Sequence, residues 1–208
     1  MYYLDKAIIL SRKDYREDDL LISVYTQKHG KIVLQAKGAK KIKSKLAGHI
    51  EPMNLVELNW VAGKGRDKLI GASGIESFKS IKENDRKVYY GFYFLDVVNK
   101  SIRLHHPDKR IFEFLKSVLY RLVETRDLAS LQIIKLAFDY KLLYLLGYHP
   151  SNRGELGVGM QNLIKEIIRL PVDRIAELKL NMLELDSKAQ EFLEEVIEEE
   201  IISLKSLK

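Results

Sequence analysis

The 208-residue chain contains no cysteine. This absence excludes disulfides, thiolate ligation of zinc or iron–sulfur clusters, and thiol nucleophiles, and it fits a reducing compartment. Long apolar runs are also missing. The opening stretch MYYLDKAIIL carries Asp5 and Lys6 inside its apolar run, which is not typical of a signal peptide, and no later segment approaches the roughly 18 apolar residues of a membrane span. We therefore expect a soluble cytoplasmic protein with no membrane partner.

Acidic residues are missing from one particular stretch. Between Asp19 and Glu51 there is none, whereas seven lysines fall between Lys28 and Lys45. Residues 1–80 hold 15 Lys and Arg against 9 Asp and Glu, and residues 81–208 hold 20 against 20, so the first part carries the whole net charge of +6. A lysine run is often only a solvated loop. Its confinement to one part of the chain, without acids, favours a nucleic acid or another anionic partner.

Catalytic and metal-binding patterns are not found. His105 and His106 are adjacent, so on a helix they would diverge by about 100°, and the other three histidines have no partner four residues away. The stretch GKGRDK (63–68) does not meet the GxxxxGK[ST] phosphate-loop pattern and is better interpreted as a basic hairpin loop. A GxSxG nucleophile elbow is absent as well. We predict no enzyme, no catalytic residue, no metal site and no cofactor.

The hydrophobic pattern before residue 80 has a period of two, which is typical of strands. Leu20, Ile22 and Val24 alternate with Leu21, Ser23 and Tyr25. Glycine-containing links separate the apolar runs. Five short strands in under eighty residues predict a small antiparallel barrel of the OB-fold type, which binds oligonucleotides on an open face and its neighbouring loops. The predicted strands are 2–11, 19–27, 31–37, 53–61 and 67–77.

After residue 80 the pattern becomes helical. Apolar residues from Phe112 to Leu122 repeat at three and four residues, with Pro107 suited to the first turn. Residues 128–146 are apolar on nearly every side and predict a buried helix that ends at Gly147.

A last amphipathic helix is indicated by apolar positions from Ala189 to Leu204, with Ser187 and Gln190 spaced as a capping box. Residues 150–160 form a glycine-rich break. The predicted fold class is α+β, with an OB-fold DNA-binding domain at 1–80 and a helical, partner-binding domain at 81–208.

In such a barrel, lysines would track phosphates while exposed aromatic rings stack on bases. Tyr25 is expected on the strand face opposite Leu20 and Ile22. Trp60 lies close to the basic turn but alternates with Val56 and Leu58, which is more typical of a core position than of a stacking surface. The candidate nucleic-acid contacts are Lys31, Lys37, Lys40, Lys41, Lys43, Lys45, Lys64, Arg66, Lys68, Tyr25 and Trp60.

Two stretches resemble a known family. Residues 15–46, YREDDLLISVYTQKHGKIVLQAKGAKKIKSKL, are similar to the amino-terminal signature of the RecO family, in which Y-x-E-x-D precedes a strand ending T-x-x-x-G-K, followed by A-K-G-[AV]-[RK]-[RK]-x-[KR]-S-x-L. Residues 141–150, KLLYLLGYHP, resemble the family's L-L-x-x-L-G-Y-x-P. Many members follow the second motif with zinc-binding cysteines, which this chain lacks.

The resemblance implies a recombination mediator associated with the nucleoid. Such a protein binds single- and double-stranded DNA, anneals complementary strands and, with RecR, helps to place RecA on strands coated by single-strand-binding protein. An RNA-binding OB protein and a scaffold that docks an acidic protein tail remain alternatives. For the acidic tail of single-strand-binding protein we expect a site near helix 107–126, away from the acidic last helix, formed by Lys109, Arg110, Phe112 and Lys116.

Overall fold

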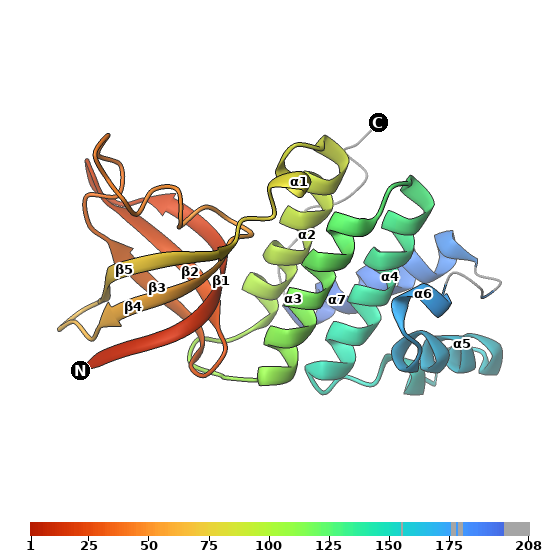
Figure 1. Ribbon diagram of the computed structural model, residues 1–208. Coiled ribbons are helices and arrows are strands. Elements are labelled where there is room, and N and C mark those ends of the chain that lie inside the picture. Colours follow the sequence, from red (N-terminus) through yellow and green to blue (C-terminus); the bar gives the residue numbers. More distant parts are fainter. Residues whose placement is uncertain (155, 176–177, 179–180, 198–208) are drawn as a thin grey trace. The chain divides into compact units, whose positions relative to one another are not determined.

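The computed structural model describes residues 1–154, 156–175, 178 and 181–197. It divides into two compact units, Met1–Val123 and Glu124–Lys208, here called the barrel unit and the helical unit. The barrel unit begins with five strands and continues with helices (Figure 1). Its elements are β1 (Tyr2–Asp14), β2 (Leu20–Thr26), β3 (Gly30–Ala36), β4 (Leu55–Val61), β5 (Asp67–Glu76), α1 (Lys79–Lys82), α2 (Asp85–Ser101) and α3 (Lys109–Glu124).

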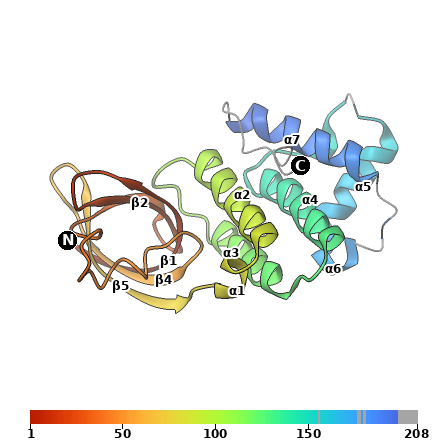
Figure 2. The ribbon, with the colours of Figure 1, turned by 90° about the horizontal axis from the view of Figure 1, so that it is seen from above.

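The five strands form a closed barrel in the order β1-β2-β3-β5-β4. Neighbouring strands pair antiparallel except β3 and β5, which pair parallel through Leu34–Ala36 and Asp67–Leu69. Figure 2 shows the strands as a ring. The predicted α+β class and the five-stranded OB-type barrel are confirmed, and each observed strand overlaps the predicted one.

The interior of the barrel is filled by alternate side chains of the strands, which face inward. On β4, Val56, Leu58 and Trp60 are all buried, and β2 contributes Ile22 and Val24. Opposite positions on the same strands face outward. Because the barrel closes on itself, this one apolar set of alternating residues supplies its core.

Helices α2 and α3 and the segment between them lie against the outside of β2 and β3. The Ser23 hydroxyl donates to the Asn99 side chain over 2.7 Å, and the Gln27 side-chain amide donates to Glu113 over 3.0 Å. Gly30 has a φ of +70°, and a Cβ there would stand 2.5 Å from the His106 backbone. Only glycine permits this close approach.

These contacts explain why the barrel unit extends to Val123. The change from strands to helices falls between Glu76 and Lys79, next to the predicted domain boundary at residue 80. The helices that follow nevertheless belong with the barrel, because they cover the side chains that β2 and β3 point outward.

The helical unit is built around α4 (Leu128–Leu145), which is buried over most of its length, as predicted. The helix ends in a Schellman arrangement: the Tyr148 N–H donates to the Leu143 carbonyl and the Gly147 N–H to the Tyr144 carbonyl, each over 3.0 Å. The other elements are η1 (Pro150–Asn152), α5 (Val158–Arg169), α6 (Val172–Ile175) and α7 (Met182–Ile197).

A buried charge cluster joins α4 to α7. The Lys135 ammonium lies 2.7 Å from an Asp139 carboxylate oxygen and 2.6 Å from one of Asp186, and its side chain is only 4% exposed. Burial alone would lower the pKa of Lys135, but the two carboxylates outweigh it and raise the pKa above its ordinary value. The Tyr140 hydroxyl adds a bond to the Leu185 carbonyl.

Three helix predictions were wrong in detail. Pro107 precedes α3 rather than lying in its first turn. The last helix begins at Met182, where the Asn181 carbonyl accepts the first helical bond from Leu185, so Ser187 lies inside the helix and caps nothing. Helix α5 begins within the predicted glycine-rich break. Leu204, expected in the last helix, lies outside the described residues.

Candidate nucleic-acid interface

The lysine-rich segment 37–45, here called the basic loop, leaves β3 and is held at its start by Asp19. One Asp19 carboxylate oxygen accepts the Gly38 N–H over 2.8 Å and the other accepts the Gln35 side-chain amide over 2.7 Å. These two hydrogen bonds, the first being the larger effect, lower the pKa of Asp19. The carboxylate from the β1–β2 turn therefore fixes the exit of the basic loop.

Two lysines of the basic loop are paired with acids. Lys40 lies 3.1 Å from Asp14 and Lys41 lies 3.4 Å from Asp18. These acids are distant in sequence, but the register of β2 and β3 pairs Leu20 with Ala36 and so brings the β1–β2 turn beside the loop. The interpretation that the lysines stand unopposed was wrong for these two, because register rather than sequence distance sets their neighbours.

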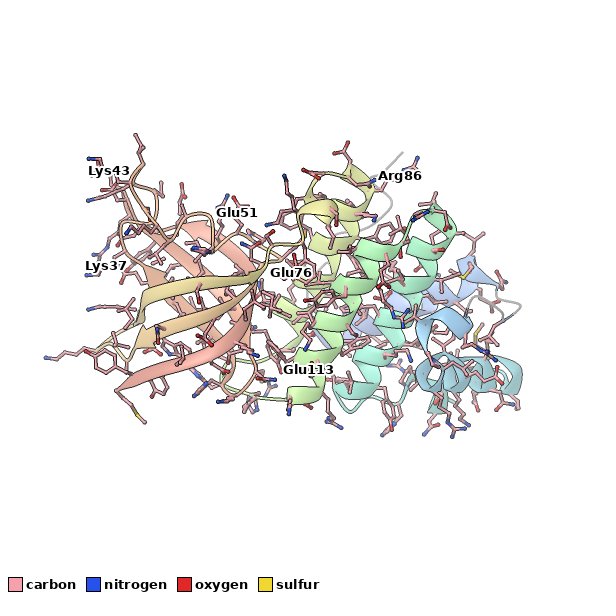
Figure 3. The ribbon with its side chains drawn as sticks, in the orientation of Figure 1. Lys37, Lys43, Glu51, Glu76, Arg86 and Glu113 are labelled. Atoms are coloured by element: carbon pink, nitrogen blue, oxygen red, sulfur yellow. The ribbon has the colours of Figure 1, made fainter. Side chains whose placement is uncertain are left out.

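The remaining lysines of the basic loop extend into solvent. Lys37, Lys43 and Lys45 are exposed, and within the described part of the chain their side chains make no hydrogen bond or ion pair. In Figure 3, Lys37 and Lys43 lie at the end of the barrel that faces away from α2 and α3, whereas Glu113 lies on the helix side. The barrel unit thus presents unpaired positive charge at its free end.

The β4–β5 loop adds cations to the same end. The Arg66 guanidinium lies 5.2 Å from the centre of the Tyr15 ring, and the Arg16 guanidinium lies 5.2 Å from the same centre. Lys68 pairs in register with Gln35 of β3, two residues before the basic loop begins, and it is exposed like Lys64. Sequence reasoning missed Arg16, although it stands beside a tyrosine of the matched motif.

Tyr25 does not present a stacking surface, so this prediction is corrected. Its side chain is fully buried. The hydroxyl accepts the Asp108 N–H over 3.1 Å and donates to the Asp108 carbonyl over 3.2 Å, which fastens β2 to the segment before α3. Burial raises the pKa of Tyr25 to about 12.

Trp60 and Lys31 are also corrected. Trp60 is 2% exposed and stacks on Tyr3 inside the barrel, with ring centres 5.2 Å apart. The alternation with Val56 and Leu58 already carried this signal. The Lys31 ammonium donates to the Asn99 carbonyl over 2.5 Å and so binds α2 rather than solvent.

The residues predicted to receive an acidic tail do not form an apolar groove. Phe112 is 1% exposed, so its ring is not available at the surface. Arg110 binds the Asp108 carboxylate over 2.7 Å, and Lys116 forms an ion pair with Glu113. Lys109 is exposed. Burial of Phe112 removes the apolar floor that the prediction required.

The described residues offer no arrangement for a metal. None of their His, Asp and Glu side chains gather in groups of three or more that could hold an ion. The segment after LGYHP has no cysteine, so it does not fit the zinc site that the family resemblance implies. Within the same described ranges, every helix is too short or too polar to cross a membrane.

Comparison with known proteins matches both parts of the chain to one family. Residues 1–78 match the family model for the recombination protein O N terminal, and residues 83–162 match the recombination protein O C terminal. The DNA repair protein RecO of Clostridium novyi is 33% identical over 144 residues, covering 69% of this chain and 55% of that protein.

Two further relatives agree. The DNA repair protein RecO of Myxococcus xanthus is 30% identical over 149 residues, covering 71% of this chain and 60% of that protein. The DNA repair protein RecO of Listeria welshimeri is 29% identical over 146 residues, covering 70% of this chain and 56% of that protein. The chain thus matches little more than half the length of these relatives. With both family models matched in order and the barrel in place, the chain belongs to the RecO family.

Proposed function

We propose that this protein binds DNA through the free end of its barrel and acts as a recombination mediator in DNA repair. The observation that carries the proposal is the set of exposed cations at that end, which make no ion pair within the described residues: Lys37, Lys43, Lys45, Lys64 and Lys68. Unpaired lysines bind phosphates without first breaking a protein contact. The relatives named DNA repair protein RecO support the same role.

The chemistry proposed is binding rather than catalysis. Lysines that contact only phosphates read no base sequence, so the protein would hold any single or double strand. A protein that holds two complementary strands without sequence preference favours their annealing. We further propose, on the family membership, that RecR and the tail of single-strand-binding protein are partners, that RecA is loaded as a result, and that the protein associates with the nucleoid.

The first experiment is a titration of the full chain with labelled single-stranded DNA, duplex DNA, single-stranded RNA and an acidic peptide at several salt concentrations. The proposal expects DNA binding that weakens steeply with salt and does not depend on base sequence. Preference for RNA over DNA would identify an RNA-binding protein instead. Binding of the acidic peptide alone would identify a scaffold.

A second measurement addresses annealing. Two complementary oligonucleotides, one carrying a fluorophore and the other a quencher, are mixed with and without the protein. The proposal expects faster quenching with the protein present and no chemical change in either strand. DNA binding without acceleration would remove annealing from the proposed function and leave binding intact.

A further inference from the structure

Ile42, at the centre of the basic loop, is fully exposed to solvent. It is the most exposed large hydrophobic side chain among the described residues, ahead of Leu183 and Met1. A single exposed apolar residue is ordinary on a protein surface. The surroundings of Ile42 are not ordinary, because Lys40, Lys41 and Lys43 stand within two residues of it.

The loop holds Ile42 in this position. The Lys41 N–H donates to the Gly38 carbonyl over 3.2 Å, and the Ser44 N–H donates to the Lys41 carbonyl over 2.8 Å, so Ile42 occupies a hydrogen-bonded turn. Residues on either side are anchored: Ala39 is 1% exposed and Leu46 packs against the barrel core. The basic loop therefore buries Ala39 while it keeps Ile42 in solvent.

Further contacts tie the same turn to the barrel. The Lys40 N–H donates to the Asp18 carbonyl over 3.0 Å, and the ion pairs of Lys40 with Asp14 and Lys41 with Asp18 lie on the same side. Lys43, the next residue after Ile42, carries no such restraint within the described residues. The turn thus combines a fixed apolar tip with a free cation.

The chemistry of this tip fits unstacked bases. Base faces are apolar, and isoleucine is among the side chains that proteins insert beside or between bases while neighbouring cations hold the phosphates. A lipid surface fits less well, because interfacial binding needs a broad apolar face, and Ile42 is the one exposed apolar side chain of residues 37–45.

We propose that Ile42 is a nucleobase contact that packs against unstacked bases of single-stranded DNA while the neighbouring lysines bind the phosphates. This inference rests on the proposed function and adds an apolar, salt-independent part to binding. In a fully paired duplex the base faces are covered by stacking, so Ile42 contributes less there. The contact gives the protein a preference for unpaired strands.

The test compares wild type with Ile42→Ser and Ile42→Leu, using a single-stranded oligonucleotide that contains 2-aminopurine and the corresponding duplex. We expect Ile42→Ser to weaken single-strand binding about tenfold, the scale of one buried aliphatic side chain, with the slope of log K against log salt unchanged. Duplex binding should change less, and Ile42→Leu should bind like wild type. At saturation, Ile42→Ser should give a smaller 2-aminopurine fluorescence change.

Lys43→Ala is the matched control, because it removes a charge from the next position. It should reduce the salt slope and leave the fluorescence change at saturation intact. The exposed position of Ile42 means that all variants should melt at the wild-type temperature.

The outcomes are separable. If Ile42→Ser binds single strands like wild type with the same fluorescence change, the base contact is wrong while DNA binding stands. If wild type binds no DNA at all, the proposed function and this inference both fail. If Ile42→Ser loses binding only to anionic phosphatidylserine vesicles and not to DNA, the tip contacts lipid and the inference is overturned.

Discussion

At the residue scale, Asp19 determines how the basic loop starts. One of its carboxylate oxygens accepts the Gly38 N–H and the other accepts the Gln35 side-chain amide. An acid therefore organises the most basic part of the chain. The positive charges of Arg16 and Lys37 also help to lower the pKa of Asp19.

The lowered pKa of Asp19 gives a pH-dependent stability. Because the folded-state pKa lies below the ordinary value of 3.8, the carboxylate stabilises the fold at any pH well above 3.8, and this contribution is lost as the pH falls through the folded-state pKa. The asparagine of Asp19→Asn cannot ionise. Its NH2 group replaces one carboxylate oxygen, so the Gln35 side-chain amide loses its acceptor. Urea unfolding should therefore show the variant less stable at neutral pH. The difference should narrow as the pH falls through the folded-state pKa of Asp19, and a difference that stays constant from neutral pH into acid would contradict this account.

Tyr25 gives the opposite pH dependence. At neutral pH, Tyr25→Phe should lower the free energy of unfolding by about 1 to 3 kcal/mol, because the buried Asp108 N–H loses its acceptor. Burial raises the pKa of Tyr25 to about 12, so the neutral hydroxyl stabilises the fold fully below 10.0, and the effect is lost as the pH rises towards 12.

The phenylalanine variant has no hydroxyl to titrate. The stability difference from wild type should therefore narrow between pH 10.0 and about 12, as measured by urea unfolding. A difference that stays constant across this range would show that the Tyr25 hydroxyl is not protected from ionisation in the folded protein.

At the element scale, α4 and α7 are joined by a charge in an apolar setting. Lys135→Met would remove the ammonium that lies 2.7 Å from the fully buried Asp139, and we expect a loss of about 3–5 kcal/mol in the free energy of unfolding of the helical unit. Adding Asp139→Leu should recover most of the loss, since the partly exposed Asp186 can turn to water. Urea unfolding followed by circular dichroism measures both variants.

Lys188→Met on α7 provides the control, because its partner Glu191 lies at the surface. That change should alter the stability by no more than about 0.5 kcal/mol. If Lys135→Met were equally mild, the buried cluster would not be what fixes α7 to α4.

Some elements follow from local pattern and others do not. Strands β2, β3 and β4 were predictable because buried and less buried positions alternate along much of their length, and α4 because it is apolar on nearly every side. Helix α2 carries aromatic residues on successive positions, so no clear face marks it. Its path instead depends on Gly91, where a Cβ would stand 2.7 Å from the Met53 side chain of the barrel unit. A contact between residues so distant in sequence leaves no local signal.

In the candidate site, too, some features have a local signal in the sequence and others depend on residues far away in the chain. The lysine run marked the basic loop correctly, since charge without acids is visible in the sequence. The partners of Lys40 and Lys41 depend on strand register, and the burial of Tyr25 depends on Asp108, 83 residues away. The sequence pattern therefore located the basic surface, but it did not show which of the predicted residues are exposed and without an ion-pair partner.

At the scale of the whole molecule, five exposed lysines that form no ion pair within the described residues gather at the free end of the barrel unit. Figure 3 shows Lys37 and Lys43 at the free end, with Glu76 and Glu113 on the helix side. The unpaired lysines at the free end attract an approaching polyanion to that end. The net charge of +6 is thus less informative than its position.

This arrangement predicts the salt dependence of binding. If the five unpaired lysines contact phosphates, log K for single strands against log salt should slope near −3.5, at roughly 0.7 per contact. Lys43→Ala with Lys45→Ala should reduce the slope by about 1.4 and weaken all sequences alike. Fluorescence anisotropy with labelled single-stranded DNA at four salt concentrations measures this slope.

Arg86→Ala with Arg103→Ala removes the same charge from exposed positions outside the basic loop. This matched pair should leave the slope unchanged. An equal reduction by both pairs would mean that net charge, rather than the free end of the barrel, determines binding.

The bond between Tyr25 and Asp108 also bears on how the protein is made. Synthesis proceeds from the amino terminus, at about 5–20 residues per second, and early parts fold as they emerge. All five strands are present once Glu76 has left the ribosome, so the basic end can take shape then. The opposite side keeps Tyr25 uncovered until Asp108 arrives. The nascent barrel is therefore complete at its basic end before it is complete at the side that α2 and α3 later cover.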